Sequence, residues 1–282
     1  MRDRLLRDGY IILAAVFVGL RLFSIQPWAD SVDAYAYWTT RTGDFYAAAE
    51  TGQIGAYLYS PAFAQALAPL VALPLALFTA LWTALNFAAL WWLLRRWALP
   101  SLLFLPIPFE IISGNVHLLY AVAIVAGFRY PVSWALMLLT KVTPGVGLLW
   151  FVARREWRAL AIAIGFTAAI VAVSFVLDRS AWEGWIAILR NDLAGAGQAS
   201  FETVGWYLAV PLLPRLVVAA ILTVAAALTD RRWLVPVAVV IALPVIWLNG
   251  LAVLAAVVPL WLARTRAVDE RHPATIAEAS RP

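Results

Sequence analysis

Long runs of hydrophobic residues, separated by short polar stretches, recur along almost the whole chain. The longer runs approach the roughly 20 residues that a helix needs to cross a hydrocarbon core of ~30 Å. The apolar positions within them are continuous and do not alternate, so the pattern is not that of a membrane β-barrel. The sequence therefore predicts an all-α fold, a polytopic integral membrane helical bundle.

These runs predict about ten transmembrane helices within a single domain that covers residues 1–267. The runs are 9–25, 60–73, 75–94, 99–111, 115–128, 132–152, 157–177, 206–228, 233–248 and 251–263. Outer-face loops are expected at about 26–59 and 178–205, and a disordered cytoplasmic tail at 268–282. Three runs in the first half are short for a full span, which favours half-helices there.

Arginines gather in short clusters between the apolar runs, as the positive-inside rule describes for cytoplasmic loops. An N-terminus in the cytoplasm and an even helix count place the clusters at 154–158, 230–232 and 264–266 inside. The loop at 26–59, with four acids and one arginine, then faces outward from a plasma membrane. One cluster disagrees, because this topology places Arg95 and Arg96 outside.

The composition agrees with a membrane protein and restricts its chemistry. Charged residues make up 13% of the chain, the mean hydropathy is +0.84, and cysteine is absent, so neither disulfides nor thiolate chemistry is available. The basic balance does not indicate nucleic-acid binding, because the arginines belong to the loops. Two histidines are too few for a histidine metal cluster. Asp30 and Asp44 are acids that could hold a hard divalent cation, but they belong to no spaced ligand set, so the sequence indicates no cofactor and no metal site.

The first polar loop contains DAYAYWTTRTGDFY, at residues 33–46. A short helix here would place Asp33, Tyr37 and Arg41 on one face, at four-residue spacing. Two interpretations stay open. In the first, this face meets a polar substrate. In the second, Asp30 or Asp33 caps the helix and the aromatic rings anchor it at the membrane interface.

Lys141 is the single lysine of the chain and stands in the apolar run ALMLLTKVTP. A charge inside a membrane is costly and is usually functional or paired. Lys141 is therefore either a contact for a lipid phosphate, or a structural partner of Glu110, or a side chain that extends to the interface. Arg129, Arg179 and Arg190 are further phosphate candidates, although the sequence around each favours an ordinary interfacial charge.

A second stretch with polar residues, FEIISGNVH, lies where two short apolar runs meet and contains Glu110, Asn115 and His117. A lone histidine at a helix start is more typical of a structural residue than of a catalyst. His117 alone therefore does not indicate a reaction.

Several segments occur in an order typical of one enzyme family. They are Asp33 with Tyr37, GDFY at 43–46, YLYSPAFAQALAPLVALP, LWTALNFAALWWLL, SGNVHLLYAVAI, LLTKVTPGVGLLWFVARREWRAL and GAGQASFETVGW. Over residues 9–206 this ordered set resembles the glycosyltransferase 87 family, membrane mannosyltransferases of the GT-C class that use polyprenyl-phosphate sugars. The chain departs from the family by being short, since members commonly have additional C-terminal helices.

The resemblance implies transfer of a hexose, with mannose expected, from a polyprenyl-phosphate donor to a hydroxyl of a lipid or glycan acceptor at the outer face. It implies inversion, with Asp33 as the base, Asp44 as the second candidate and Asp30 as the third. The residues expected to bind substrate are Tyr37, Arg41, Tyr59, Glu110, Asn115, His117 and Lys141.

A non-catalytic membrane protein is the alternative hypothesis: a lipid or glycan transporter, or a degenerate GT-C relative that acts as an assembly partner. A transporter would show repeated halves with polar residues at the midplane in both. The chain shows one midplane cation and no visible repeat, which favours the transferase. A requirement for Asp33 would separate the transferase from a degenerate relative.

Overall fold

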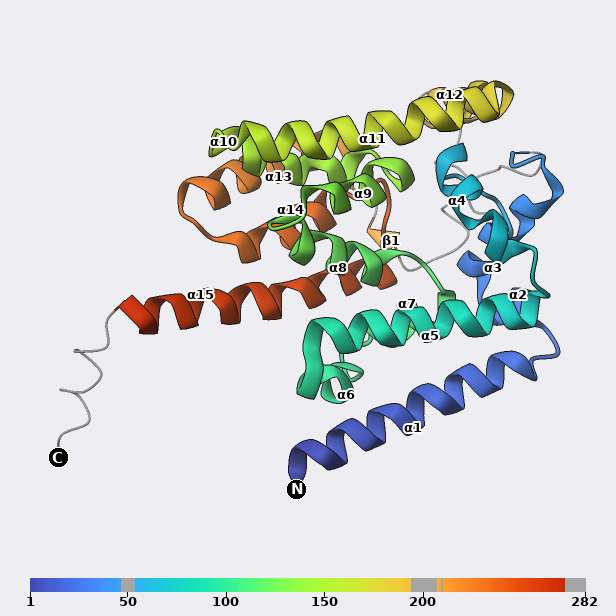
Figure 1. The fold of residues 1–282 in the computed structure, drawn as a ribbon, viewed down its shortest axis with the longest axis horizontal. Coiled ribbons are helices and arrows are strands. Elements are labelled where there is room, and N and C mark those ends of the chain that lie inside the picture. Colours follow the sequence, from blue (N-terminus) through green and yellow to red (C-terminus); the bar gives the residue numbers. More distant parts are fainter. Residues whose placement is uncertain (47–53, 194–206, 209, 272–282) are drawn as a thin grey trace.

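The computed structural model describes residues 1–46, 54–193, 207–208 and 210–271, and these are mostly helical (Figure 1). The two strands, β1 (Tyr207–Leu208) and β2 (Ile246–Trp247), pair antiparallel over two residues each. The prediction of an all-α fold is confirmed for this part of the chain. Within the predicted outer loop at 178–205, the structure has the helix α12 (Arg179–Leu193).

Two long helices, α1 (Arg2–Leu22) and α5 (Leu75–Leu94), pack side by side in opposite directions (Figure 1). The Tyr10 hydroxyl of α1 donates a 2.5 Å hydrogen bond to the Phe87 carbonyl of α5. The intervening α4 (Pro61–Val71) does not cross the bundle and stays at the end where α1 finishes. The chain therefore returns along α5 to the end that holds its N-terminus.

This arrangement corrects the topology predicted for Arg95 and Arg96. They follow α5 directly in the 3-10 helix η2 (Arg95–Trp97), and the next helix, α6 (Ala98–Ser101), contacts the first half of α1. Both arginines thus lie at the same end as the other arginine clusters (Figure 1). The prediction failed because it counted the run at 60–73 as a full span.

The middle of the bundle is broken into short helices. They are α7 (Pro106–Ser113), α8 (His117–Gly127), η3 (Pro131–Trp134), α9 (Ala135–Thr140), η4 (Thr143–Leu148) and α10 (Leu149–Ala153). The axes of α7 and α8 differ by 110°. Prolines near the start of several of these helices lack the backbone N–H that a continuous helix needs, which explains why the runs at 99–111 and 132–152 are divided.

Within the described residues, three helical stretches are long and apolar enough to cross a membrane: Leu75–Ser101, Trp157–Leu177 and Leu248–Thr265. The bent pair of α7 and α8 makes a fourth if it counts as one span. The predicted count of ten is therefore not confirmed. Among the shorter helices, α8 packs against α5 and against the helical stretch Leu248–Thr265, where protein can satisfy the backbone groups at its ends.

The second half of the chain completes the bundle. Its elements are α11 (Trp157–Leu177), α13 (Leu212–Leu228), η6 (Arg232–Leu234), α14 (Val235–Ile241), η7 (Leu248–Ala256) and α15 (Val257–Arg271). The buried residues of α11 are Ala163 and Ser174, so most of this helix is free to face lipid. Because α15 continues to Arg271, the first residues of the predicted tail are helical, and residues 272–282 lie outside the described part.

The first polar loop is fixed against the bundle by a buried arginine. It contains α2 (Pro27–Asp30), α3 (Val32–Trp38) and the 3-10 helix η1 (Thr39–Thr42). Arg21, at the end of α1, donates hydrogen bonds to the carbonyls of Asp30, at 2.5 Å, and Ile112, at 2.9 Å. The Ser31 hydroxyl donates to the same Ile112 carbonyl. These bonds hold the start of α3 beside the end of α7.

Candidate active site

Helix α3 turns Asp33 and Tyr37 toward the bundle, as their four-residue spacing predicts. Tyr37 is buried and Asp33 is partly buried. Arg41 does not join them: it is exposed, with its guanidinium 3.6 Å from the centre of the Trp38 ring. The backbone changes from α-helix to 3-10 helix at Thr39, and the different number of residues per turn moves Arg41 off this face.

Close approach of α3 to the α7–α8 corner requires a glycine. Gly114 has φ +72°, and an added Cβ would lie 2.8 Å from the Cβ of Ala34. The Trp82 indole donates a 2.6 Å hydrogen bond to the Gly114 carbonyl and fixes the corner from the side of α5. The corner therefore sets the position of α3, and with it the position of Asp33.

We expect Gly114→Ala to lower the free energy of unfolding by about 2 kcal/mol or more. The left-handed backbone alone costs an alanine ~1–2 kcal/mol, and the contact with Ala34 adds to it. Thermal unfolding in detergent measures the loss. Gly165→Ala in α11 is the matched control, because its added Cβ meets nothing within 4 Å and alanine favours the helix. Equal stability of the two variants would contradict this role of the corner.

Asn115, directly after this glycine, connects to Asp33. Its side-chain oxygen accepts hydrogen bonds from the Val116 backbone N–H, at 2.8 Å, and the Tyr59 hydroxyl, at 3.4 Å. The oxygen is thereby occupied, and the amide nitrogen donates to the Asp33 carboxylate. The hydroxyls of Tyr37 and Tyr59 lie 3.2 Å apart. Asp33 thus lies at the edge of a buried polar network in which the donor and the acceptor of each bond to Asn115 are fixed.

The surroundings of Asp33 raise its pKa above the ordinary value for an aspartate. Burial is the largest cause, and the negative charge of Glu110 adds to it. The hydrogen bond from Asn115 and the positive charge of Lys141 act in the opposite direction but do not cancel the rise. A carboxylate with a raised pKa is a stronger proton acceptor than one in water.

A second network joins Glu110, His117 and Lys141. The Glu110 carboxylate is fully buried, and one of its oxygens accepts hydrogen bonds from the backbone N–H groups of His117, at 2.5 Å, and Leu118, at 3.4 Å. Its other oxygen lies 2.9 Å from Nδ1 of His117, and Nε2 of His117 lies 3.1 Å from Nζ of Lys141. The three side chains form a continuous chain of contacts.

The direction of these bonds follows from what each group can donate. A charged lysine only donates, so Nε2 of His117 accepts from Lys141, and the proton on Nδ1 is donated to Glu110. We assign this neutral tautomer from the hydrogen-bond pattern. The arrangement pairs the ammonium with a carboxylate across one imidazole ring.

Lys141 brings the two networks together. Its backbone is extended and connects α9 to η4. Its ammonium is 5.6 Å from the centre of the Tyr59 ring. The break in the helix agrees with Pro144 nearby, which loosens the turn that Lys141 would otherwise continue. One side chain, Tyr59, therefore contacts both the network of Asp33 and the ammonium.

Other candidate residues stay apart from these networks. Asp44 is exposed and accepts a 3.3 Å hydrogen bond from the Tyr46 backbone N–H. Asp30 is exposed and accepts a hydrogen bond from the Ser24 hydroxyl. The remaining phosphate candidates are all exposed: Arg129 near the Tyr130 ring, Arg179 paired with Glu183, and Arg190 on α12. The segment GAGQASFETVGW, at 195–206, lies outside the described residues.

Sequence reasoning missed Tyr120 and Thr140, which complete the surroundings of His117. Their hydroxyls lie 2.5 Å apart, and the Tyr120 ring packs edge-on against the His117 ring. The signal was present, because Tyr120 follows His117 by three residues and so shares its helix face. Thr140 precedes Lys141 directly. Among the described residues, no group of three or more histidine, aspartate or glutamate side chains is placed to hold a metal ion.

Comparison with known families gives these networks a context. The model of glycosyltransferase family 87 matches residues 57–279, which is most of the chain. The chain belongs to glycosyltransferase family 87. Together with its long apolar helices, this membership makes it a membrane glycosyltransferase that acts on a sugar donor and an acceptor. No curated protein and no solved structure matches the chain.

The family 87 match includes Tyr59, Asn115 and the whole Glu110, His117 and Lys141 network. Asp33 precedes the matched region, and its connection to that region is the hydrogen bond with Asn115. The structure therefore places this carboxylate beside residues of the matched region.

Proposed function

We propose that this family 87 glycosyltransferase moves a hexose, mannose by family resemblance, from a polyprenyl-phosphate donor to a hydroxyl of a lipid or glycan acceptor. One observation carries the proposal: Asp33, a carboxylate with a raised pKa, and Lys141, a lysine in a broken helix, belong to adjoining networks. A base and a cation are the two groups that this transfer needs from a protein.

In the proposed reaction the acceptor hydroxyl attacks the anomeric carbon of the sugar. Asp33 takes the hydroxyl proton, the new C–O bond forms, and the bond between the anomeric carbon and the phosphate oxygen breaks. The polyprenyl phosphate leaves with the electron pair, and the ammonium of Lys141 stabilises its negative charge. A single displacement inverts the anomeric configuration.

The other buried residues have positioning roles in this proposal. Asn115 holds the Asp33 carboxylate by a hydrogen bond, and the Tyr59 hydroxyl in turn holds the Asn115 side chain. Glu110 and His117, predicted to contact substrate, are 0% and 1% exposed, and their polar atoms contact protein. We therefore propose that they hold Lys141 and do not touch the sugar.

The distribution of charge supports an active site on the extracytoplasmic side of a plasma membrane. The arginine clusters lie at the end of the bundle that holds the N-terminus (Figure 1). Helices α2, α3 and α4, with Asp30, Asp33 and Asp44 nearby, lie at the other end. The positive-inside rule assigns the arginine end to the cytoplasm.

The pH dependence of transfer tests the role of Asp33. Since only its ionised form accepts a proton, kcat/KM should fall as pH falls through the raised pKa of Asp33, in a range above the ordinary ~3.9. Removing the charge in Glu110→Gln should move this fall to lower pH, because that charge raises the pKa. The measurement is kcat/KM against pH for both proteins. If kcat/KM of Glu110→Gln falls at the same pH as that of the wild type, the assignment of Asp33 is contradicted.

A further inference from the structure

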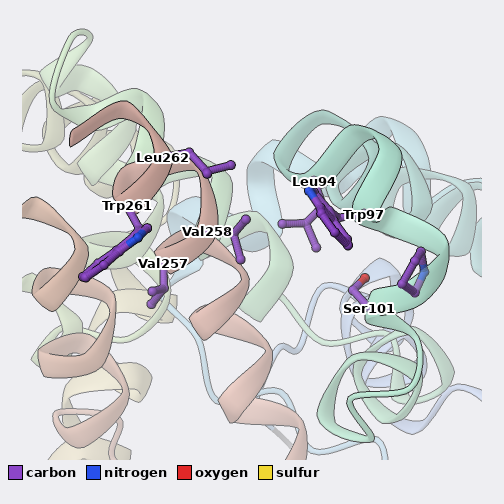
Figure 2. A pocket seen from close by; sticks show the side chains of 8 residues that line it. Leu94, Trp97, Ser101, Val257, Val258, Trp261 and Leu262 are labelled. Atoms are coloured by element: carbon purple, nitrogen blue, oxygen red, sulfur yellow. The ribbon is translucent and has the colours of Figure 1, made fainter. Parts of the chain in front are cut away.

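A groove of about 490 Å³ opens between the end of α5 and the start of α15 (Figure 2). Leu94 and Trp97 line one wall, and Val257, Val258 and Leu262 line the other. Its volume lies within the roughly 300–1,000 Å³ that is usual for small-molecule sites. The groove is at the arginine end of the bundle, because its α5 wall is the end of α5 that lies away from α3 (Figure 1).

Apolar side chains dominate this groove, and it is open at its surface. Trp97, Trp261 and Leu262 are exposed, although they belong to helical stretches long enough to span a membrane. Such side chains are stable beside hydrocarbon and costly beside water. An occupant must therefore offer an alkyl chain to the walls.

Positive charge lies beside the groove. Arg95 and Arg96 stand in the chain between the lining residues Leu94 and Trp97, and both are exposed. The Arg96 guanidinium is 5.7 Å from the centre of the Trp97 ring. None of the described side chains that line the groove is acidic. An occupant must therefore offer negative charge next to its alkyl chain.

The backbone at Arg95 is held in an unusual conformation, with φ 50° and ψ −118°. For a residue other than glycine such a conformation costs about 1–3 kcal/mol and persists where the surrounding structure imposes it. Here it ends α5 abruptly and places two adjacent arginines beside the groove.

We propose that the groove binds an anionic phospholipid of the arginine-side leaflet. An acyl chain lies between the α5 and α15 walls, and the phosphate group meets Arg95 and Arg96. Basic residues beside gaps between membrane helices recognise anionic headgroups in this way. The proposal is independent of the proposed function, because it concerns the opposite end of the bundle.

Native mass spectrometry of the purified full chain tests this site. The protein is titrated in neutral detergent with phosphatidylglycerol or with phosphatidylcholine that carries identical acyl chains. We expect one phosphatidylglycerol to be retained at a lower concentration than phosphatidylcholine. Arg95→Gln with Arg96→Gln should remove this preference. Each arginine should account for a roughly fivefold difference between the apparent affinities for the two lipids. Both residues are exposed, so the double variant keeps the core unchanged.

Two further variants assign the effect to the groove. Val258→Trp fills it and should reduce retention of both lipids. Arg41→Gln, which removes an exposed arginine at the other end of the bundle, is the matched control and should bind as the wild type does. Equal retention of the two lipids by the wild type would overturn the proposal, as would an unchanged preference in the double arginine variant. A protein dimer that excludes lipid from the groove would overturn it too, and would assign the groove to a second copy.

Discussion

Asp33→Asn should reduce the rate of sugar transfer by about 10²–10⁴-fold and leave the protein folded. Asparagine keeps the shape of the side chain but cannot take the proton of the acceptor hydroxyl. The partly buried position of Asp33, its raised pKa and its hydrogen bond from Asn115 make it the carboxylate best suited to this step among the outer-loop candidates. Initial rates with saturating donor and acceptor measure the loss.

Asp44→Asn is the matched control for this result. Asp44 is in the same loop, but it is exposed and its hydrogen bond is to the Tyr46 backbone. We expect the transfer rate of Asp44→Asn to stay within a few-fold of the wild-type rate, because substitutions at exposed positions usually have small effects. If instead Asp33→Asn is active and Asp44→Asn is not, the assignment of the base is reversed.

Replacing Lys141 by methionine should have two separate effects. Transfer should slow by about 10²–10³-fold, because the leaving phosphate loses its cationic partner. Stability should fall by about 3 kcal/mol, because Glu110 is left buried without a compensating positive charge. Rates and thermal unfolding, measured on the same preparation, give both quantities.

A double variant distinguishes the catalytic role of Lys141 from a structural one. Lys141→Met with Glu110→Gln removes both charges, and the oxygen of the introduced amide would still accept the backbone hydrogen bonds that the Glu110 carboxylate accepts. We expect stability to recover toward the wild-type value and transfer to remain slow. Recovery of both would show that Lys141 acts as the structural partner of Glu110 and has no part in the reaction.

The helices that the sequence predicted best are those with uninterrupted apolar runs. The bounds of α5 and α11 match the predicted ranges, because neither run contains a proline and Gly165 is tolerated inside α11. The predicted helix at 132–152 is instead four short elements, with a break at Lys141. Hydropathy measures transfer into a membrane and not the continuity of the backbone, so it could not locate these breaks.

The candidate site was predicted in parts and not as one arrangement: Asp33 and Tyr37 shared a helix face, and Glu110 was one of the alternatives for the partner of Lys141. The spacing of Asp33 and Tyr37 was sufficient to place them on one helix face. The contact between His117 and Lys141 depends on the bend between α7 and α8 and on the end of α9, which no local pattern specifies. The same limit explains Arg41, whose spacing fits an α-helix that in fact becomes a 3-10 helix.

The central claim is that a lipid-linked sugar is the donor for a reaction at the acidic end of the bundle. The most direct measurement offers the purified protein in liposomes a labelled hexose, either on polyprenyl phosphate or on a nucleoside diphosphate, with membrane-lipid acceptors. We predict that label moves from polyprenyl-phosphate sugars, mannose first, and not from the nucleotide sugars. Transfer from a nucleotide sugar, or no transfer from any lipid-linked donor, would contradict the account.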